Sequence, residues 1–68
     1  MTTIALFGAA GKMGTRTAAK LAESAEYHVL HVEASPRTEA VLRERGIEPA
    51  PAAVAAREAD VVVLALPD

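Results

Sequence analysis

The strongest constraint on the fold is a cluster of glycines that follows directly on an apolar run. Residues 4–7 are continuously apolar, and Gly8, Gly11 and Gly14 follow at a spacing of three. A helical pattern begins inside the cluster, at Lys12. Strand, glycine turn and helix in this order are typical of the opening of a dinucleotide-binding βαβ unit, where the backbone turns tightly and a pyrophosphate approaches it. A Cβ at these points would obstruct the turn or the phosphate.

The rest of the chain alternates between strand-like and helix-like segments. The first strand is continuously apolar at residues 4–7, which is expected where a parallel strand is covered on both faces. The predicted strands span residues 2–7, 27–33, 47–48 and 61–66, and the predicted helices span residues 12–25, 36–45 and 52–59. The sequence therefore predicts an α/β fold, a Rossmann-type βαβαβαβ parallel sheet that forms the first half of a doubly wound domain.

Local signals set the helix ends and faces. Ser35 and Pro36 read as an N-cap followed by proline at the first helical position, and Gly46 is placed to close the same helix. In the first helix, a stripe with a period of four is expected to face the sheet. It consists of Met13, Thr17, Leu21 and Ala25.

The strand at residues 47–48 is the shortest of the four. Pro49 and Pro51 follow it closely, and proline is poorly tolerated inside a sheet. We therefore expect this strand to be cut short.

Composition limits the classes of function. The 68 residues include no cysteine, which excludes disulfides and thiolate-bound zinc. The net charge is −2, the basic residues are dispersed, and Phe7 and Tyr27 are the only aromatic residues, so no nucleic-acid partner is expected. No apolar run approaches the roughly 20 residues of a membrane span, and residues 1–3 carry no basic leader. We expect a soluble cytoplasmic protein without a membrane partner.

The predicted elements make only half of a doubly wound domain. The last predicted strand is followed at once by Pro67 and Asp68. We therefore interpret residues 1–68 as the N-terminal part of a dinucleotide-binding domain, with the catalytic domain absent. No nucleophile with a base, no general base and no metal-ligand cluster is visible, so catalysis by this segment alone is not expected.

The glycine cluster predicts a phosphate site. Gly8 would take the tight turn, Gly11 would let phosphates approach, and Gly14 would let the helix pack closely on the sheet. Free N–H groups near Lys12 and Met13 would point at the pyrophosphate, where the helix dipole favours negative charge. The Lys12 ammonium adds a charge within reach of a phosphate. An ordinary glycine-rich turn is the alternative.

Glu33 predicts which dinucleotide binds. It ends the second predicted strand nineteen residues after Gly14, close to the spacing of about 20 at which an acid binds the adenosine ribose. A carboxylate there accepts hydrogen bonds from the ribose hydroxyls and repels a 2′-phosphate, which favours NAD over NADP. Arg37 leaves NADP open, because an arginine just past this position can hold that phosphate.

The remaining candidate site residues are the last three residues of the chain and the two histidines. Leu66-Pro67-Asp68 ends the last predicted strand at the edge where doubly wound folds bind ligands, so Leu66 and Pro67 are predicted to flank the nicotinamide; a plain strand-ending turn is the alternative. His28 and His31 lie on opposite faces of one strand and cannot converge on one metal ion. They are interpreted as structural.

Three separated motifs resemble one group of bacterial enzymes. Residues 4–14, residues 31–36 and residues 59–68 are similar to NAD-binding proteins of the 6-phosphogluconate-dehydrogenase-like superfamily, in particular the D-apionate oxidoisomerase group, often labelled semialdehyde-dehydrogenase NAD-binding proteins. The resemblance covers nearly the whole chain. One departure is Ala10, where that group often has glycine. The loop ending in Met13-Gly14 is shared with dihydrodipicolinate reductase, so it does not choose between families.

The resemblance implies an NAD-dependent oxidoreductase. It implies a helical C-terminal domain with the catalytic residues and the contacts of a homodimer, and a small sugar-acid-like substrate whose hydroxyl is oxidised by hydride transfer. The alternatives are an NADPH-dependent reductase of the dihydrodipicolinate type and a non-catalytic nucleotide-sensing domain. The cofactor-binding residues it implies are Gly8, Ala10, Gly11, Lys12, Met13, Gly14, Glu33, Leu66, Pro67 and Asp68.

Overall fold

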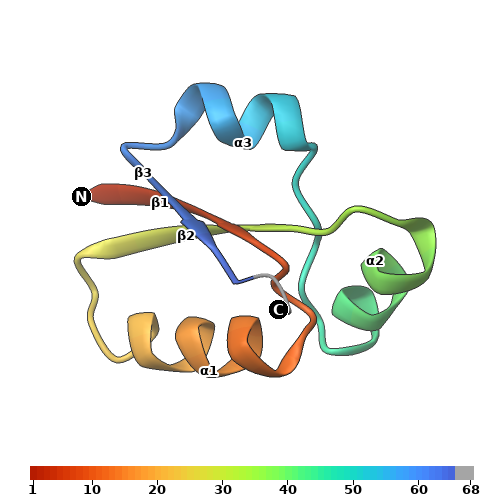
Figure 1. Cartoon of the computed structure of the whole chain (residues 1–68). Helices are drawn as coiled ribbons and strands as arrows, with labels where there is room; N and C mark the ends of the chain where they lie inside the picture. Colours follow the sequence, from red (N-terminus) through yellow and green to blue (C-terminus); the bar gives the residue numbers. More distant parts are fainter. Residues whose placement is uncertain (66–68) are drawn as a thin grey trace.

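Three strands and three helices form the chain in a computed structural model, which describes residues 1–65 (Figure 1). Residues 66–68 lie outside the described part. In chain order the elements are β1 (Thr2–Phe7), α1 (Lys12–Leu21), β2 (Tyr27–Val32), α2 (Pro36–Glu44), α3 (Ala52–Glu58) and β3 (Val61–Leu64). The predicted α/β class and Rossmann-type arrangement are confirmed.

The sheet is parallel, with β1 at its centre. Its order is β2-β1-β3, with Thr2 opposite Tyr27 on one side of β1 and Ile4 opposite Val61 on the other. The chain therefore builds outward from β1 to β2 and then returns to the opposite side of β1. This reversal creates a switch point at the carboxyl ends of the strands, which is where doubly wound folds bind ligands.

Helices cover both faces of β1, as its continuous apolar character predicted. Leu6 belongs to a buried cluster with Leu42 of α2, and Ala18 of α1 packs against the same cluster. On the other face, Ala5 and Ala55 of α3 belong to a second cluster. Figure 1 shows α1 and α3 on opposite sides of the sheet. Because β1 is buried on both faces, it fixes where its carboxyl end and the following turn must lie.

The strand expected at residues 47–48 is not formed, and this prediction is wrong. The segment runs past the edge of β2, where the Ala50 N–H donates to the His31 carbonyl at 2.8 Å. Pro49 and Pro51 flank Ala50 and bring no N–H groups of their own, so a regular strand is not propagated. The sheet of the described residues therefore has three strands instead of four.

The first helix is shorter than predicted, and its buried face differs in part from the expected stripe. It ends at Leu21, and the Ser24 hydroxyl then accepts the Glu26 N–H at 3.2 Å in the turn that follows. Gly14 is buried in this helix, whereas the Met13 side chain is 62% exposed. The expected stripe is correct for Thr17 and Leu21, which are half-buried, and wrong for Met13; Ala25 lies beyond the end of the helix.

The signals at the ends of α2 are confirmed. The Ser35 hydroxyl accepts the Thr38 N–H at 3.2 Å, with Pro36 at the first helical position. Gly46 follows the helix with φ +79°, and its N–H donates to the Arg43 carbonyl at 3.0 Å. Glycine adopts this left-handed conformation without steric strain, which explains its place at the helix end.

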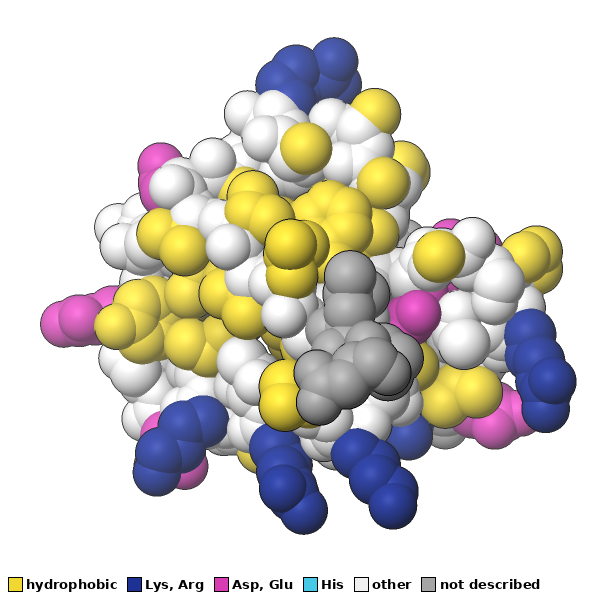
Figure 2. Space-filling view, in the orientation of Figure 1, with side chains coloured by type: hydrophobic (Ala, Val, Ile, Leu, Met, Phe, Trp, Pro, Cys, Tyr) yellow, Lys and Arg dark blue, Asp and Glu magenta, His cyan; other side chains and the backbone are white. Residues whose placement is uncertain are grey.

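The outer strand β3 leaves apolar side chains in contact with solvent. Val61, Val62 and Leu64 are exposed, Leu64 by 65%, and Figure 2 shows apolar side chains gathered over this strand. The predicted strand 61–66 is observed over Val61–Leu64. None of the helices in residues 1–65 is both long enough and apolar enough to cross a membrane.

Candidate functional site

The turn after β1, which we call the glycine loop (residues 8–14), is tied to the end of β2. Gly8 has φ +84°, the left-handed conformation required by the tight turn. The N–H groups of Gly8 and Ala9 both donate to the Val32 carbonyl, at 3.0 and 3.3 Å. The Gly11 N–H donates back to the Gly8 carbonyl at 3.2 Å. The loop is thus a defined turn at the switch point of the sheet.

Gly14 and Gly11 are glycines for different reasons. A Cβ on Gly14 would overlap the Gly8 carbonyl oxygen and would lie 2.8 Å from the Ala9 Cα. A Cβ on Gly11 would meet the Gly8 oxygen at 3.5 Å, an ordinary contact, and Gly11 is exposed. The fold itself therefore requires glycine at position 14, whereas the space beside Gly11 is open to a ligand.

Helix α1 begins without a capping side chain. Its N-cap is Gly11, and its first turn contains no acidic residue. Among residues 1–65, no acceptor is found for the N–H groups of Lys12, Met13 and Gly14. Lys12 adds a cation where the helix dipole disfavours one. Free N–H groups and a cation together suit an anion such as a phosphate.

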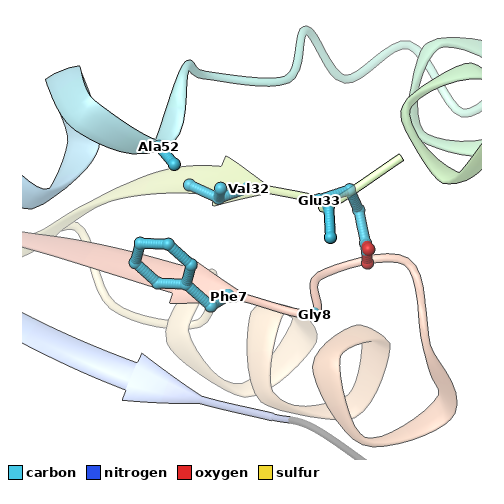
Figure 3. Close-up of a pocket in the computed structure, with 6 residues that line it drawn as sticks. Phe7, Gly8, Val32, Glu33 and Ala52 are labelled. Carbon is cyan, nitrogen blue, oxygen red and sulfur yellow. The ribbon is translucent and has the colours of Figure 1, made fainter. Parts of the chain in front are cut away.

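Glu33 reaches from the end of β2 to the glycine loop. Its Oε2 accepts the Ala10 N–H at 2.6 Å, and Figure 3 shows the carboxylate directed toward the loop. The structure thus brings the predicted ribose-binding acid next to the predicted phosphate-binding turn.

A pocket of about 220 Å³ lies beside Glu33 (Figure 3). It is bounded by the ends of β1 and β2 and by the start of α3. Its lining residues, which define what we call the strand-end pocket, are Phe7, Gly8, Val32, Glu33, Ala34 and Ala52. Ligand pockets commonly measure about 300–1,000 Å³, so this one is sized for a single moiety. Apart from Glu33, its lining side chains are apolar, which suits a flat aromatic ring.

Four of these lining residues were not among the predicted site residues: Phe7, Val32, Ala34 and Ala52. Phe7 and Val32 occupy matching positions at the ends of paired strands, so a prediction that β1 and β2 pair could have found them. Ala52 belongs to α3. The face of the sheet that α3 covers depends on the return of the chain to the other side of β1, and no local sequence signal predicts that Ala52 lines the pocket.

Two arginines near this edge have different surroundings. Arg37, in the first turn of α2, is exposed. Arg45 donates from Nη1 to the Thr15 hydroxyl at 2.9 Å, and Thr15 in turn donates to the Gly11 carbonyl at 2.7 Å. Arg45 therefore ties the end of α2 to the first turn of α1.

The two histidines do not join the site. Partial burial lowers the pKa of His31 below its usual 6.5, because desolvation disfavours the charged imidazolium. Within residues 1–65 there is no cluster of three or more His, Cys, Asp or Glu side chains that could hold a metal ion. The predicted nicotinamide-flanking residues Leu66, Pro67 and Asp68 lie outside the described residues.

Two curated relatives are similar over nearly the whole chain. D-apionate oxidoisomerase of Blautia hydrogenotrophica is 46% identical over 66 residues, covering 96% of this chain and 23% of that protein. D-apionate oxidoisomerase of Cupriavidus necator is 48% identical over 66 residues, covering 96% of this chain and 24% of that protein. The chain thus spans about a quarter of the length of these relatives.

A solved structure has the same fold over the same part. It is a semialdehyde dehydrogenase NAD-binding protein from Cupriavidus necator in complex with calcium and NAD, with a TM-score of 0.81 and 46% identity. The match covers 98% of this chain and 24% of that one. The sequence model of a family described as "NADP oxidoreductase coenzyme F420-dependent" also matches residues 3–68. The chain therefore belongs to the F420-dependent NADP oxidoreductase family.

Proposed function

We propose that this chain is the NAD(H)-binding segment of an oxidoreductase. The observation that carries the proposal is the position of Glu33, whose carboxylate lies against the glycine loop and also borders the strand-end pocket. One side chain thereby links a phosphate-binding turn to an apolar pocket, as adenosine diphosphate requires.

Each part of the site has a separate task in this proposal. The free N–H groups of Lys12, Met13 and Gly14 hold the pyrophosphate, with the Lys12 ammonium beside them. Glu33 accepts hydrogen bonds from the adenosine ribose, and the strand-end pocket holds the adenine. The bound nicotinamide supplies hydride-transfer chemistry, and Leu66, Pro67 and Asp68 are proposed to flank it.

The substrate and the assembly are proposed from the relatives. Two relatives are named D-apionate oxidoisomerases, which favours a small sugar acid whose hydroxyl is oxidised. Catalytic residues and a homodimer interface are proposed to lie in a further domain, because no general base stands near the site in residues 1–65.

The family description names NADP, whereas the solved neighbour contains NAD. Glu33 favours NAD here, because its negative charge repels a 2′-phosphate. Arg37 is exposed in the next turn and is the feature that favours NADP, as in the alternative reductase of the dihydrodipicolinate type.

A titration with NADH and NADPH, followed by nicotinamide fluorescence, tests the proposal. We expect NADH to bind at least tenfold more tightly. Tighter binding of NADPH would contradict the NAD assignment and favour the alternative. Binding of neither cofactor would contradict the proposed function as a whole.

A further inference from the structure

The end of β2 holds three consecutive N–H groups of the glycine loop. The Val32 carbonyl accepts the N–H groups of Gly8 and Ala9, and the Glu33 carboxylate accepts that of Ala10. The first two bonds use backbone atoms and would form with any residue at position 32. The third bond depends on the side chain at position 33, so it is the one of the three bonds that requires a particular residue.

The bond to Ala10 has the properties of a strong hydrogen bond. Its length is 2.6 Å, it is partly buried, and it joins residues 23 positions apart. Hydrogen bonds to ionised groups are shorter and about twice as strong as those between neutral groups. Without Glu33, the half-buried Ala10 N–H would have no acceptor among residues 1–65.

The carboxylate can hold the loop and a ligand at the same time. Oε2 accepts the Ala10 N–H, while no hydrogen bond to Oε1 is found among the described residues. An ionised carboxylate has about four lone-pair sites on its two oxygens. Oε1 is therefore available to ribose hydroxyls while Oε2 stays on the loop.

We propose that Glu33 is a positioning residue for the glycine loop, through Ala10, in addition to its part in recognising the ribose. Its charge and its hydrogen bond then have separate effects. The charge sets the preference against a 2′-phosphate, and the bond to Ala10 sets the shape of the phosphate-binding turn. The ligand-binding part of this inference rests on the proposed function, whereas the positioning part concerns the free protein.

Two variants separate the effects. Glu33→Gln removes the charge but keeps a carbonyl oxygen that can accept the Ala10 N–H. Glu33→Ala removes both. Glu58→Gln, at an exposed position on α3, is the matched control for loss of one negative charge.

Amide hydrogen exchange of the ligand-free protein, measured by NMR, tests the positioning. The readout is the exchange rate of the Ala10 N–H divided by that of Ala9, so that a global loss of stability cancels. We expect Glu33→Ala to raise this ratio about tenfold and Glu33→Gln and Glu58→Gln to change it less than threefold. An unchanged ratio in Glu33→Ala would overturn the proposal.

Binding of inorganic pyrophosphate, measured by calorimetry, tests the consequence for the loop. Both Glu33 variants lack the charge, so a difference between them reports the loss of the acceptor side chain and not the loss of charge. We expect Glu33→Ala to bind at least threefold more weakly than Glu33→Gln, and equal affinities would overturn the effect on the phosphate site. Failure of the unsubstituted protein to bind pyrophosphate would count against the proposed function, while the exchange ratio still decides the positioning role.

Discussion

Helices α1 and α2 both begin at the carboxyl edge of the sheet, yet their first turns differ. Ser35 caps α2 by accepting the Thr38 N–H, and Glu39 lies in the first turn of that helix. Helix α1 has glycine at its N-cap, no acid in its first turn, and Lys12 instead. Unpaired N–H groups and a cation destabilise a helix start. Helix α2 is therefore capped by its own residues, whereas the first N–H groups of α1 have no acceptor among residues 1–65.

The largest expected effect comes from Gly14→Ala at the start of α1. The new Cβ would lie 2.8 Å from the Ala9 Cα, and backbone cannot move aside as a flexible side chain can. We expect a loss of about 3 kcal/mol in the free energy of unfolding, the upper end of typical overpacking costs, measured by urea denaturation. Gly11→Ala is the matched control, with an expected loss of less than about 1 kcal/mol. Similar losses in both variants would refute the distinction between these glycines.

The next effect concerns the cap of α2. Ser35→Ala removes the acceptor of the Thr38 N–H, and loss of such a cap typically costs about 1 kcal/mol. Urea denaturation measures it. The reciprocal change, Gly11→Ser, supplies a cap to α1 and should weaken NADH binding with little effect on stability. If Gly11→Ser leaves NADH affinity unchanged, the uncapped start of α1 is not the phosphate site.

A smaller effect is expected from Lys12→Gln. Removing a cation from the first turn of α1 should raise the ligand-free stability by roughly 0.5 kcal/mol and weaken NADH binding. Lys20→Gln, in the last turn of the same helix, is the control, because a cation there is favourable and its loss should lower stability slightly. Thermal denaturation measures both stability changes. If the two substitutions changed the stability in the same direction, the helix dipole would not explain the effect.

The smallest expected effect concerns His31, which lies in β2 and at neither helix start. The pKa of His31 is lowered in the folded protein by partial burial, so the unfolded chain binds a proton more readily. Stability should therefore fall as the pH drops below 6.5 toward the lower folded pKa. We expect His31→Gln to reduce this dependence in urea denaturation at a series of pH values. If His31→Gln left the pH dependence of stability unchanged, that dependence would arise from other groups.

Much of the site was predictable because its signals are local. The positive φ of Gly8, the close packing of Gly14 and the Ser35 cap each depend on a few neighbouring residues, and all three agree with the sequence-based expectations. The position of Glu33 beside the loop was also predictable, since adjacent parallel strands bring their carboxyl ends together. The specific bond to Ala10 was not, because it depends on how the turn orients one N–H group.

The errors arise where periodicity or composition alone was used to place a residue. Periodicity placed Met13 on the buried face of α1, but its side chain is 62% exposed, and Gly14 makes the close contact with the backbone of residues 8–9. Residues 47–48 have the composition of a strand, yet no strand forms there. The segment runs along the edge of β2, and Pro49 and Pro51 have no N–H groups with which to continue a ladder.

The sequence alone determined the βαβ opening, the uncapped start of α1 and the acid at the end of β2, because glycine conformation, capping and apolar runs act within a few residues. The tertiary structure decided the strand order, the strand-end pocket, and which atom of the loop Glu33 holds. The strand order and the pocket depend on the return of the chain to the far side of β1, which brings β3 beside that strand and places α3 over the opposite face. No local pattern encodes that return. The bond to Ala10 depends on how the turn orients that N–H group.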